Sequence, residues 1–111
     1  MMRATDLIAA NRPLDREELE IWIHEELVVA TRDAADLVFT DRECARVRLI
    51  CTLRYELEVE RDTLPVIMSL LDQLYEARGR LRALGAAVVA QDPVIRDAIL
   101  ARLAPEAPEG G

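Results

Sequence analysis

Seven apolar residues between positions 67 and 88 recur in alternating steps of three and four, and this pattern restricts the fold more than any other feature. They are Ile67, Leu70, Leu74, Ala77, Leu81, Leu84 and Val88. The spacing places them along one side of a single α-helix and is typical of a coiled-coil seam. A chain of 111 residues has little left to cover a seam of about 30 Å, whereas a second copy of the helix covers it. We therefore expect a homodimer; the alternative is a helix that packs on its own domain.

The charge of the chain disfavours nucleic acid as a partner. Its formal net charge is −7, its isoelectric point is near 4.7, and all fourteen basic side chains are arginines. Such a chain lacks the broad basic surface that neutralises phosphates, unless its arginines cluster. No apolar run approaches the roughly 20 residues of a membrane span, and the N-terminal residues do not form a signal peptide. We expect a cytoplasmic protein without a membrane segment.

The sequence contains few candidates for catalytic or metal-binding residues. Cys44 and Cys51 are seven apart on one predicted helix, so their Cα atoms lie about 10 Å apart, too far for a disulfide. Together with the distant His24 they match no zinc-binding spacing. The sequence contains neither a glycine-rich phosphate loop nor a nucleophile with a histidine at motif spacing. We expect no catalytic residues, no metal and no cofactor, and we interpret both cysteines as small core hydrophobes.

Capping and periodicity predict two helices and a hairpin in the first forty residues. A short helix is expected over residues 5–10, followed by a helix from Asp15 to Glu26. Asp15 and Glu18 have the spacing of a capping box, and Leu19, Trp22 and Ile23 share the apolar face. Residues 27–29 and 37–39 are two apolar runs around a polar loop, and they predict a small β-hairpin.

Three further helices follow. Thr40 to Glu43 form another capping-box pattern that begins a helix ending near Leu57 or Glu58. Its predicted apolar face contains Cys44, Val47, Ile50, Cys51 and Leu57. A charged connection over 58–62 leads to the long helix near Pro65, which Gly85 loosens or ends, and Asp92 caps a last short helix. We divide the chain into a domain over 1–60, a dimerisation helix with a helical tail over 61–104, and a disordered tail over 105–111.

The order of these elements resembles the MerR-type winged helix-turn-helix: mainly α, with a β-hairpin wing and a long C-terminal coiled-coil dimerisation helix. Within that fold, residues 14–84 are most similar to the CbpM family of chaperone modulators. The stretches that carry the resemblance are Glu17–Leu19, Val38–Asp41, Leu53–Leu57 and Met68–Asp72. The resemblance implies a protein without catalytic residues that binds the J domain of a CbpA/DnaJ-type co-chaperone and inhibits its stimulation of Hsp70. The alternative is a MerR-like DNA-binding transcription regulator.

The second helix favours the chaperone modulator over the DNA-binding protein. Residues 15–26 contain six acidic side chains and one arginine, in the helix that enters the major groove in DNA-binding relatives. With the apolar side buried, an acidic outer face remains, and it would suit the basic helix of a J domain. The residues predicted to bind the partner there are Glu17, Glu20, Ile21, His24 and Glu25. The alternative is that these acids only make the helix soluble.

Two features outside that helix keep alternatives open. Tyr55 belongs to a stretch shared with the modulators and is predicted to contact the partner, with helix packing as the other interpretation. Arg42, Arg46, Arg48 and Arg54 line the third helix as a basic strip. This strip is the best support for DNA binding, and the alternative is that its members pair with neighbouring acids such as Glu43 and Glu56.

Overall fold

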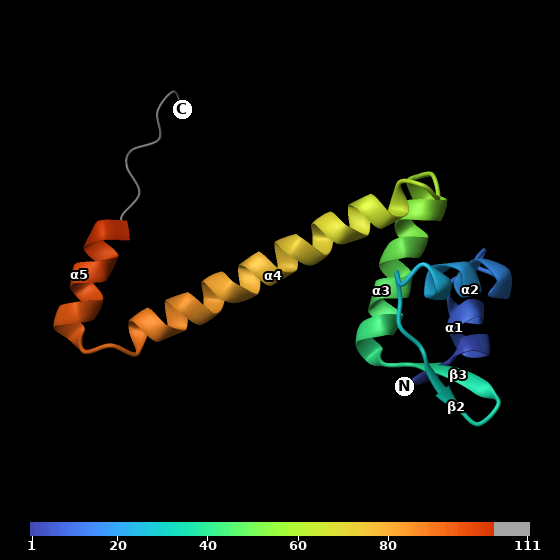
Figure 1. The fold of residues 1–111 in the computed structure, drawn as a ribbon, viewed down its shortest axis with the longest axis horizontal. Coiled ribbons are helices and arrows are strands. Elements are labelled where there is room, and N and C mark those ends of the chain that lie inside the picture. Colours follow the sequence, from blue (N-terminus) through green and yellow to red (C-terminus); the bar gives the residue numbers. More distant parts are fainter. Residues whose placement is uncertain (104–111) are drawn as a thin grey trace. The chain divides into compact units, whose positions relative to one another are not determined.

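The computed structural model describes residues 1–103, and the predicted disordered tail lies outside this range. The chain is mainly helical, with one small antiparallel sheet (Figure 1). It forms two compact units, one over Met1–Leu70 and one that begins at Leu71, and each is described by itself. Among the described helices, none combines the length and apolar character needed to cross a membrane.

The chain begins with a two-residue strand and a short helix. Strand β1 (Met2–Arg3) leads into α1 (Ala4–Ala10), which confirms the helix predicted over 5–10. Ala4 and Leu7 are buried on its inner side. Asn11 ends the helix, and its side-chain amide donates a hydrogen bond to the carbonyl of Leu7 at 2.9 Å. The strand was not predicted, because two residues are too few to show an alternating pattern.

Helix α2 (Arg16–His24) begins where it was predicted and ends two residues early. A carboxylate oxygen of Asp15 accepts a hydrogen bond from the Glu18 amide at 2.8 Å, as an N-cap residue does. At the other end Glu26 has a positive φ of 62°. The Leu27 amide then bonds to the Trp22 carbonyl at 2.9 Å and the Glu26 amide to the Ile23 carbonyl at 3.0 Å. This is a Schellman motif, and it turns the chain away from the helix axis.

The sheet contains three strands, in the order β1-β3-β2. Strand β2 (Thr31–Asp33) pairs antiparallel with β3 (Asp36–Phe39), and Met2 of β1 lies opposite Phe39. The strand predicted at 37–39 is confirmed, but the one predicted at 27–29 is wrong. The Schellman motif leaves both Leu27 and Val28 buried, whereas successive side chains of a strand point to opposite faces. The apolar run is therefore part of a buried turn, and pairing begins only at Thr31.

Helix α3 (Asp41–Cys51) starts at the predicted cap and continues as a π-helix, η1 (Thr52–Glu56). The Thr40 hydroxyl accepts a hydrogen bond from the Glu43 amide at 3.3 Å. Val47, Ile50 and Cys51 are buried, as predicted, but the Leu57 side chain is 65% exposed. A π turn takes more residues than an α turn, so residues beyond it leave the buried face that α-helical spacing predicts.

Two helices make up the rest of the described chain. Helix α4 (Leu64–Val89) passes through Gly85 without a break, which corrects the prediction that this residue loosens or ends it. Helix α5 (Pro93–Leu103) is capped as predicted. One carboxylate oxygen of Asp92 accepts hydrogen bonds from the amides of Val94 and Ile95 at 3.1 and 3.2 Å.

The hydrophobic core belongs to the unit over Met1–Leu70. Its largest fully buried side chains are Trp22, Phe39, Leu7, Leu14, Leu19, Ile50, Leu64, Met68, Val28 and Val47. They come from α1, α2, β3, α3 and the beginning of α4, and from the connections on either side of α2, which contain Leu14 and Val28. This core holds the inner side of α2 and leaves its outer side to solvent.

Candidate functional site

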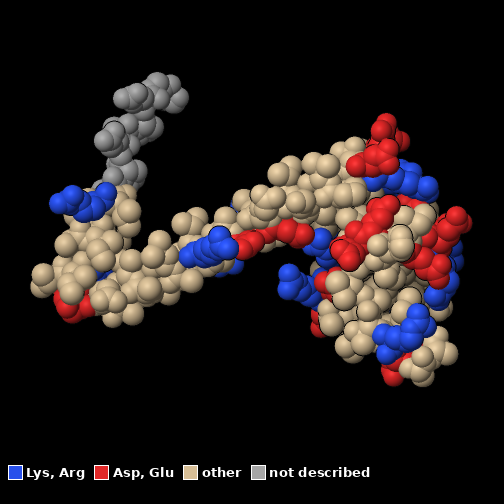
Figure 2. Space-filling view, in the orientation of Figure 1, with Lys and Arg blue, Asp and Glu red and all other residues tan. Residues whose placement is uncertain are grey.

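The acidic face of α2 consists of Glu17, Glu20, Ile21, His24 and Glu25. The structure brings these five predicted partner-binding residues together, since they lie three or four apart along one helix and its C-cap. The three carboxylates and His24 are exposed, and Ile21 is partly exposed. Figure 2 shows carboxylates gathered over the part of the molecule that contains α2. The face therefore combines one apolar side chain with surrounding negative charge.

The opposite side of α2 keeps this face in place. Leu19 and Trp22 are each only 1% exposed, because they pack into the core. Ile23, which was expected to be buried with them, is partly exposed. The helix is thus fixed by two large apolar side chains, and its acidic face cannot turn inward without unpacking the core.

Tyr55 lies on η1 and packs against the buried side of α2, not on its acidic face. Its ring is 6.4 Å from that of Trp22, centroid to centroid, at an interplanar angle of 40°. Burial and the nearby Glu18 carboxylate raise the pKa of Tyr55 to about 12. Tyr55 therefore takes part in helix packing, and because it is partly exposed, its predicted contact with a partner stays a prediction.

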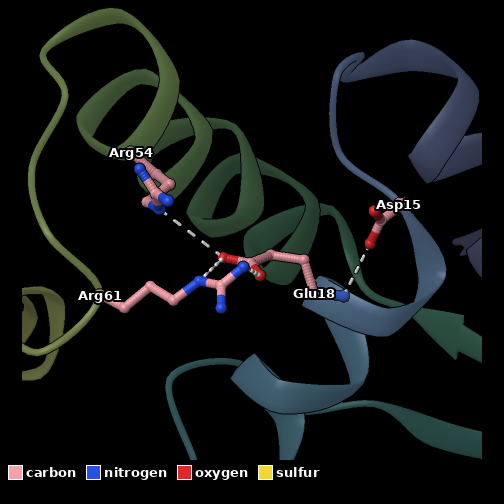
Figure 3. A network of polar contacts seen from close by, with 4 residues as sticks. All are labelled: Asp15, Glu18, Arg54 and Arg61. Atoms are coloured by element: carbon pink, nitrogen blue, oxygen red, sulfur yellow. Dashed lines mark hydrogen bonds and ion pairs between the residues drawn. The ribbon is translucent and has the colours of Figure 1, made fainter.

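Glu18 makes an ion-pair network that the sequence did not predict (Figure 3). Its side chain is only 5% exposed, and Arg61 contacts both of its oxygens, Nη2 to Oε2 at 2.7 Å and Nε to Oε1 at 3.2 Å. The buried Nε of Arg54 lies 3.8 Å from Oε1, too far for a hydrogen bond. The network joins α2, η1 and the connection that precedes α4.

Sequence reasoning placed Glu18 in a capping box, with its carboxylate at the start of α2. The backbone half of that box is present, since the Glu18 amide donates to Asp15, but the carboxylate faces Arg61 instead. One signal was available in the sequence. Glu18 lies four residues before Trp22 and next to Leu19, so helical spacing puts it on the buried side. A buried acid needs a cationic partner, so this position predicts a contact with one of the arginines later in the chain.

In the second capping-box pattern, Thr40 to Glu43, the acid likewise contacts a distant segment of the chain. The Glu43 carboxylate accepts a hydrogen bond from the Val29 amide at 2.7 Å, which ties the segment before β2 to α3. Arg46 Nε donates to the carbonyl of Leu27 in the same segment. In both boxes the second acid binds a distant part of the chain, and this gives the unit long-range polar contacts.

These contacts separate the four arginines of the predicted basic strip into two that face the protein and two that are exposed. Arg46 and Arg54 face the protein: Arg46 donates to the Leu27 carbonyl, and Arg54 lies beside the Glu18 carboxylate. Arg42 and Arg48 are exposed on α3. Two of the four arginines therefore have structural roles, and a DNA-contacting strip would have to rely on the other two.

Neither cysteine has a reactive environment. Cys44 and Cys51 are free thiols; Cys51 is buried and Cys44 is partly exposed. Burial and the Glu18 carboxylate raise the pKa of Cys51 to about 11, and burial, with Asp41 next, raises the pKa of Cys44. A raised pKa keeps a thiol in its unreactive protonated form. Within residues 1–103, no three His, Cys, Asp or Glu side chains are grouped so that they could hold a metal ion.

The seven seam residues all lie on α4, and none of them is buried. Leu70, Leu74, Leu81 and Leu84 are between 43% and 67% exposed. Ala77 is also exposed, while Ile67 and Val88 are partly exposed. The structure thus confirms the helix, and none of the described residues covers its apolar side enough to bury it.

No family model matches the chain, and the searches of curated proteins and of solved structures found no significant match either. The choice among functions therefore depends on the chemistry of the acidic face and on the resemblance described above.

Proposed function

We propose that this chain is a chaperone modulator with a MerR-like winged-helix arrangement, which binds the J domain of a DnaJ-type co-chaperone. Binding uses the acidic face of α2 and prevents the co-chaperone from stimulating its Hsp70 partner. The observation that carries the proposal is the acidic face itself: three exposed carboxylates surround Ile21 on a helix that the core holds in place.

The physical basis is charge complementarity with a small apolar centre. J domains present a basic helix to Hsp70, and a surface of opposite charge accelerates encounter and fixes orientation. Ile21 supplies the apolar contact that a charged rim surrounds in many interfaces. A modulator that occupies the basic helix excludes Hsp70 from it, so inhibition requires no catalytic residue.

DNA binding is the second candidate, because Arg42 and Arg48 are exposed on α3. The acidic face opposes it, since carboxylates brought near phosphates repel them and release no counterions. Salt-dependent binding of random duplex DNA would favour this candidate. We expect no binding at physiological salt.

The test is a calorimetric titration of the full chain with the J domain of a co-chaperone from the same organism, at two salt concentrations. We expect saturable binding that weakens as salt rises. Hsp70 ATPase activity, stimulated by the co-chaperone, should fall as the chain is added. A dissociation constant of about 100 μM is weaker than that of most specific complexes. If no heat of binding is detected at this protein concentration, the proposal is refuted.

Charge reversal locates the site. Replacing Glu17, Glu20 and Glu25 by lysine should weaken J-domain binding by about 100-fold, because like charges brought together cost several kcal/mol. The matched control replaces the exposed Glu56, Glu60 and Asp62 by lysine, which changes the net charge equally. Equal loss in both variants would show that only net charge matters and would contradict binding through the acidic face.

A further inference from the structure

The last part of α4 is positively charged, unlike the chain before it. Residues 78–89, the basic end of α4, contain Arg78, Arg80 and Arg82 and no acid. Residues 1–77 contain nine arginines and seventeen acids, a formal charge of −8. Arg80 pairs with the exposed Glu76, whereas no ion pair within residues 1–103 includes Arg78 or Arg82. The basic end therefore has exposed cations with few partners among the described residues.

Exposed apolar side chains lie between these arginines. Leu81 and Leu84 are 67% and 61% exposed, and Val88, one turn after Leu84, is partly exposed. At about 100° per residue these three form one stripe, with two of the arginines on one side of it and the third on the other. In Figure 2 a stretch of α4 without charged side chains follows the arginines. The basic end is thus an apolar stripe bordered by cations.

This combination suits the surface of a membrane. In helices that lie on a membrane, apolar side chains enter the boundary between headgroups and acyl chains, while arginines beside them reach the lipid phosphates. Each basic residue close to an anionic membrane strengthens binding. Duplex DNA would neutralise the arginines but leave the leucines in water, and another helix would cover the leucines but does not require the arginines. A lipid surface satisfies both kinds of side chain.

We infer that the basic end of α4 binds the surface of a membrane that contains anionic lipids. Its residues extend about 18 Å, less than the roughly 30 Å of a hydrocarbon core, so the helix lies in the plane of the interface. Leu81, Leu84 and Val88 face the acyl chains, and the arginines contact the headgroups. The acidic face of α2 takes no part, so this inference and the proposed function can fail separately.

The test is cosedimentation of the full chain with phospholipid vesicles. We expect binding to phosphatidylcholine vesicles with about one third phosphatidylglycerol, and about tenfold weaker binding to phosphatidylcholine alone. Binding should weaken as salt rises, because salt screens the attraction between arginines and headgroups. No binding to the anionic vesicles at about 1 mM lipid, or equal binding to both kinds of vesicle, would overturn the inference.

Replacing arginines locates the charge that binds. Glutamine in place of all three arginines of the basic end should weaken vesicle binding about 100-fold, because three headgroup contacts are lost. The matched control places glutamine at three exposed arginines of the N-terminal unit, Arg12, Arg32 and Arg42, which changes the net charge equally. This control should weaken binding less than about threefold, since salt screens distant charges. Equal losses would show that net charge alone matters and would overturn the inference.

Two pairs of leucines on α4 test the apolar contact. Leu81→Ser combined with Leu84→Ser removes most of the stripe and should weaken vesicle binding about tenfold or more. Leu70→Ser combined with Leu74→Ser is the control, because both residues belong to the predicted seam but precede the basic end. It should change vesicle binding less than about threefold. Equal losses would show that binding depends on pairing of α4 with another helix, and would overturn direct contact with lipid.

Random duplex DNA distinguishes a lipid surface from nucleic acid. We expect that DNA does not displace the chain from anionic vesicles at physiological salt, because it offers the leucines no apolar contact. Displacement by DNA, together with full DNA affinity in the variant Leu81→Ser, Leu84→Ser, would assign the arginines to nucleic acid and overturn the inference.

Discussion

Removal of the Arg61 side chain tests whether the Glu18 network holds α2 on the core. Arg61→Ala takes away both hydrogen-bonding contacts to a carboxylate that is 5% exposed and leaves Arg54 at 3.8 Å as its cationic neighbour. Breaking a buried ion pair costs about 3–5 kcal/mol. Because the Arg61 side chain is 60% exposed, solvent screens part of this interaction, and we expect a loss of about 1–3 kcal/mol in the free energy of unfolding.

The assay is urea unfolding followed by Trp22 fluorescence, since Trp22 lies one turn after Glu18 on the same helix and is buried in the same unit. Arg3→Ala is the control: Arg3 is 65% exposed and pairs with Asp36 at 3.6 Å, but Asp36 is itself 28% exposed. Its removal should cost less than about 1 kcal/mol. A second comparison places Arg61→Ala in a Glu18→Leu background, where it should have little effect. Equal losses from Arg61→Ala and Arg3→Ala would refute the argument that burial of Glu18 sets the cost.

Two further predictions concern the backbone and the titration of the core. Glu26→Gly should raise the free energy of unfolding by about 1 kcal/mol, since glycine adopts a φ of 62° without the steric cost that a side chain imposes, and an unchanged urea midpoint would contradict this. Folding raises the pKa of Cys51 from 9.0 to about 11 and that of Tyr55 from 10.0 to about 12. The unfolded chain therefore loses these protons first, so stability is full below about pH 9 and falls as the pH rises toward 12. Urea midpoints at pH 8, 9.5 and 10.5 measure the decline, and Cys51→Ala should flatten its beginning; a decline of the same size in that variant would show that the thiol does not contribute.

Local signals in the sequence located most of the helices. The starts of α2, α3 and α5 follow from Asp15, Thr40 and Asp92, whose side chains accept hydrogen bonds from backbone amides within three residues. Such contacts depend only on neighbours in the chain, and they can be predicted from spacing alone. The long α4 was equally clear, because the steps of three and four persist over many residues.

The errors arise where one apolar run is compatible with more than one structure. Residues 27–29 have the composition of a strand, but the positive φ at Glu26 ends α2 in a Schellman motif that buries Leu27 and Val28 as a turn. Leu57 fits the α-helical face of α3, but the π-helix before it changes the spacing. In both cases a backbone hydrogen bond at a helix end decides the structure. The spacing of apolar side chains does not predict such a bond.

The acidic face of α2 was determined by the sequence itself. Once Leu19 and Trp22 are placed in the core, helical geometry alone puts Glu17, Glu20 and Glu25 outside, and the structure exposes all three. What only the tertiary structure decided is the different role of Glu18, which lies in the same acidic run. Its carboxylate meets Arg61, forty-three residues away, because the fold brings the connection before α4 against α2. Periodicity tells which side of a helix is buried, but it does not tell which distant side chain meets a charge buried there.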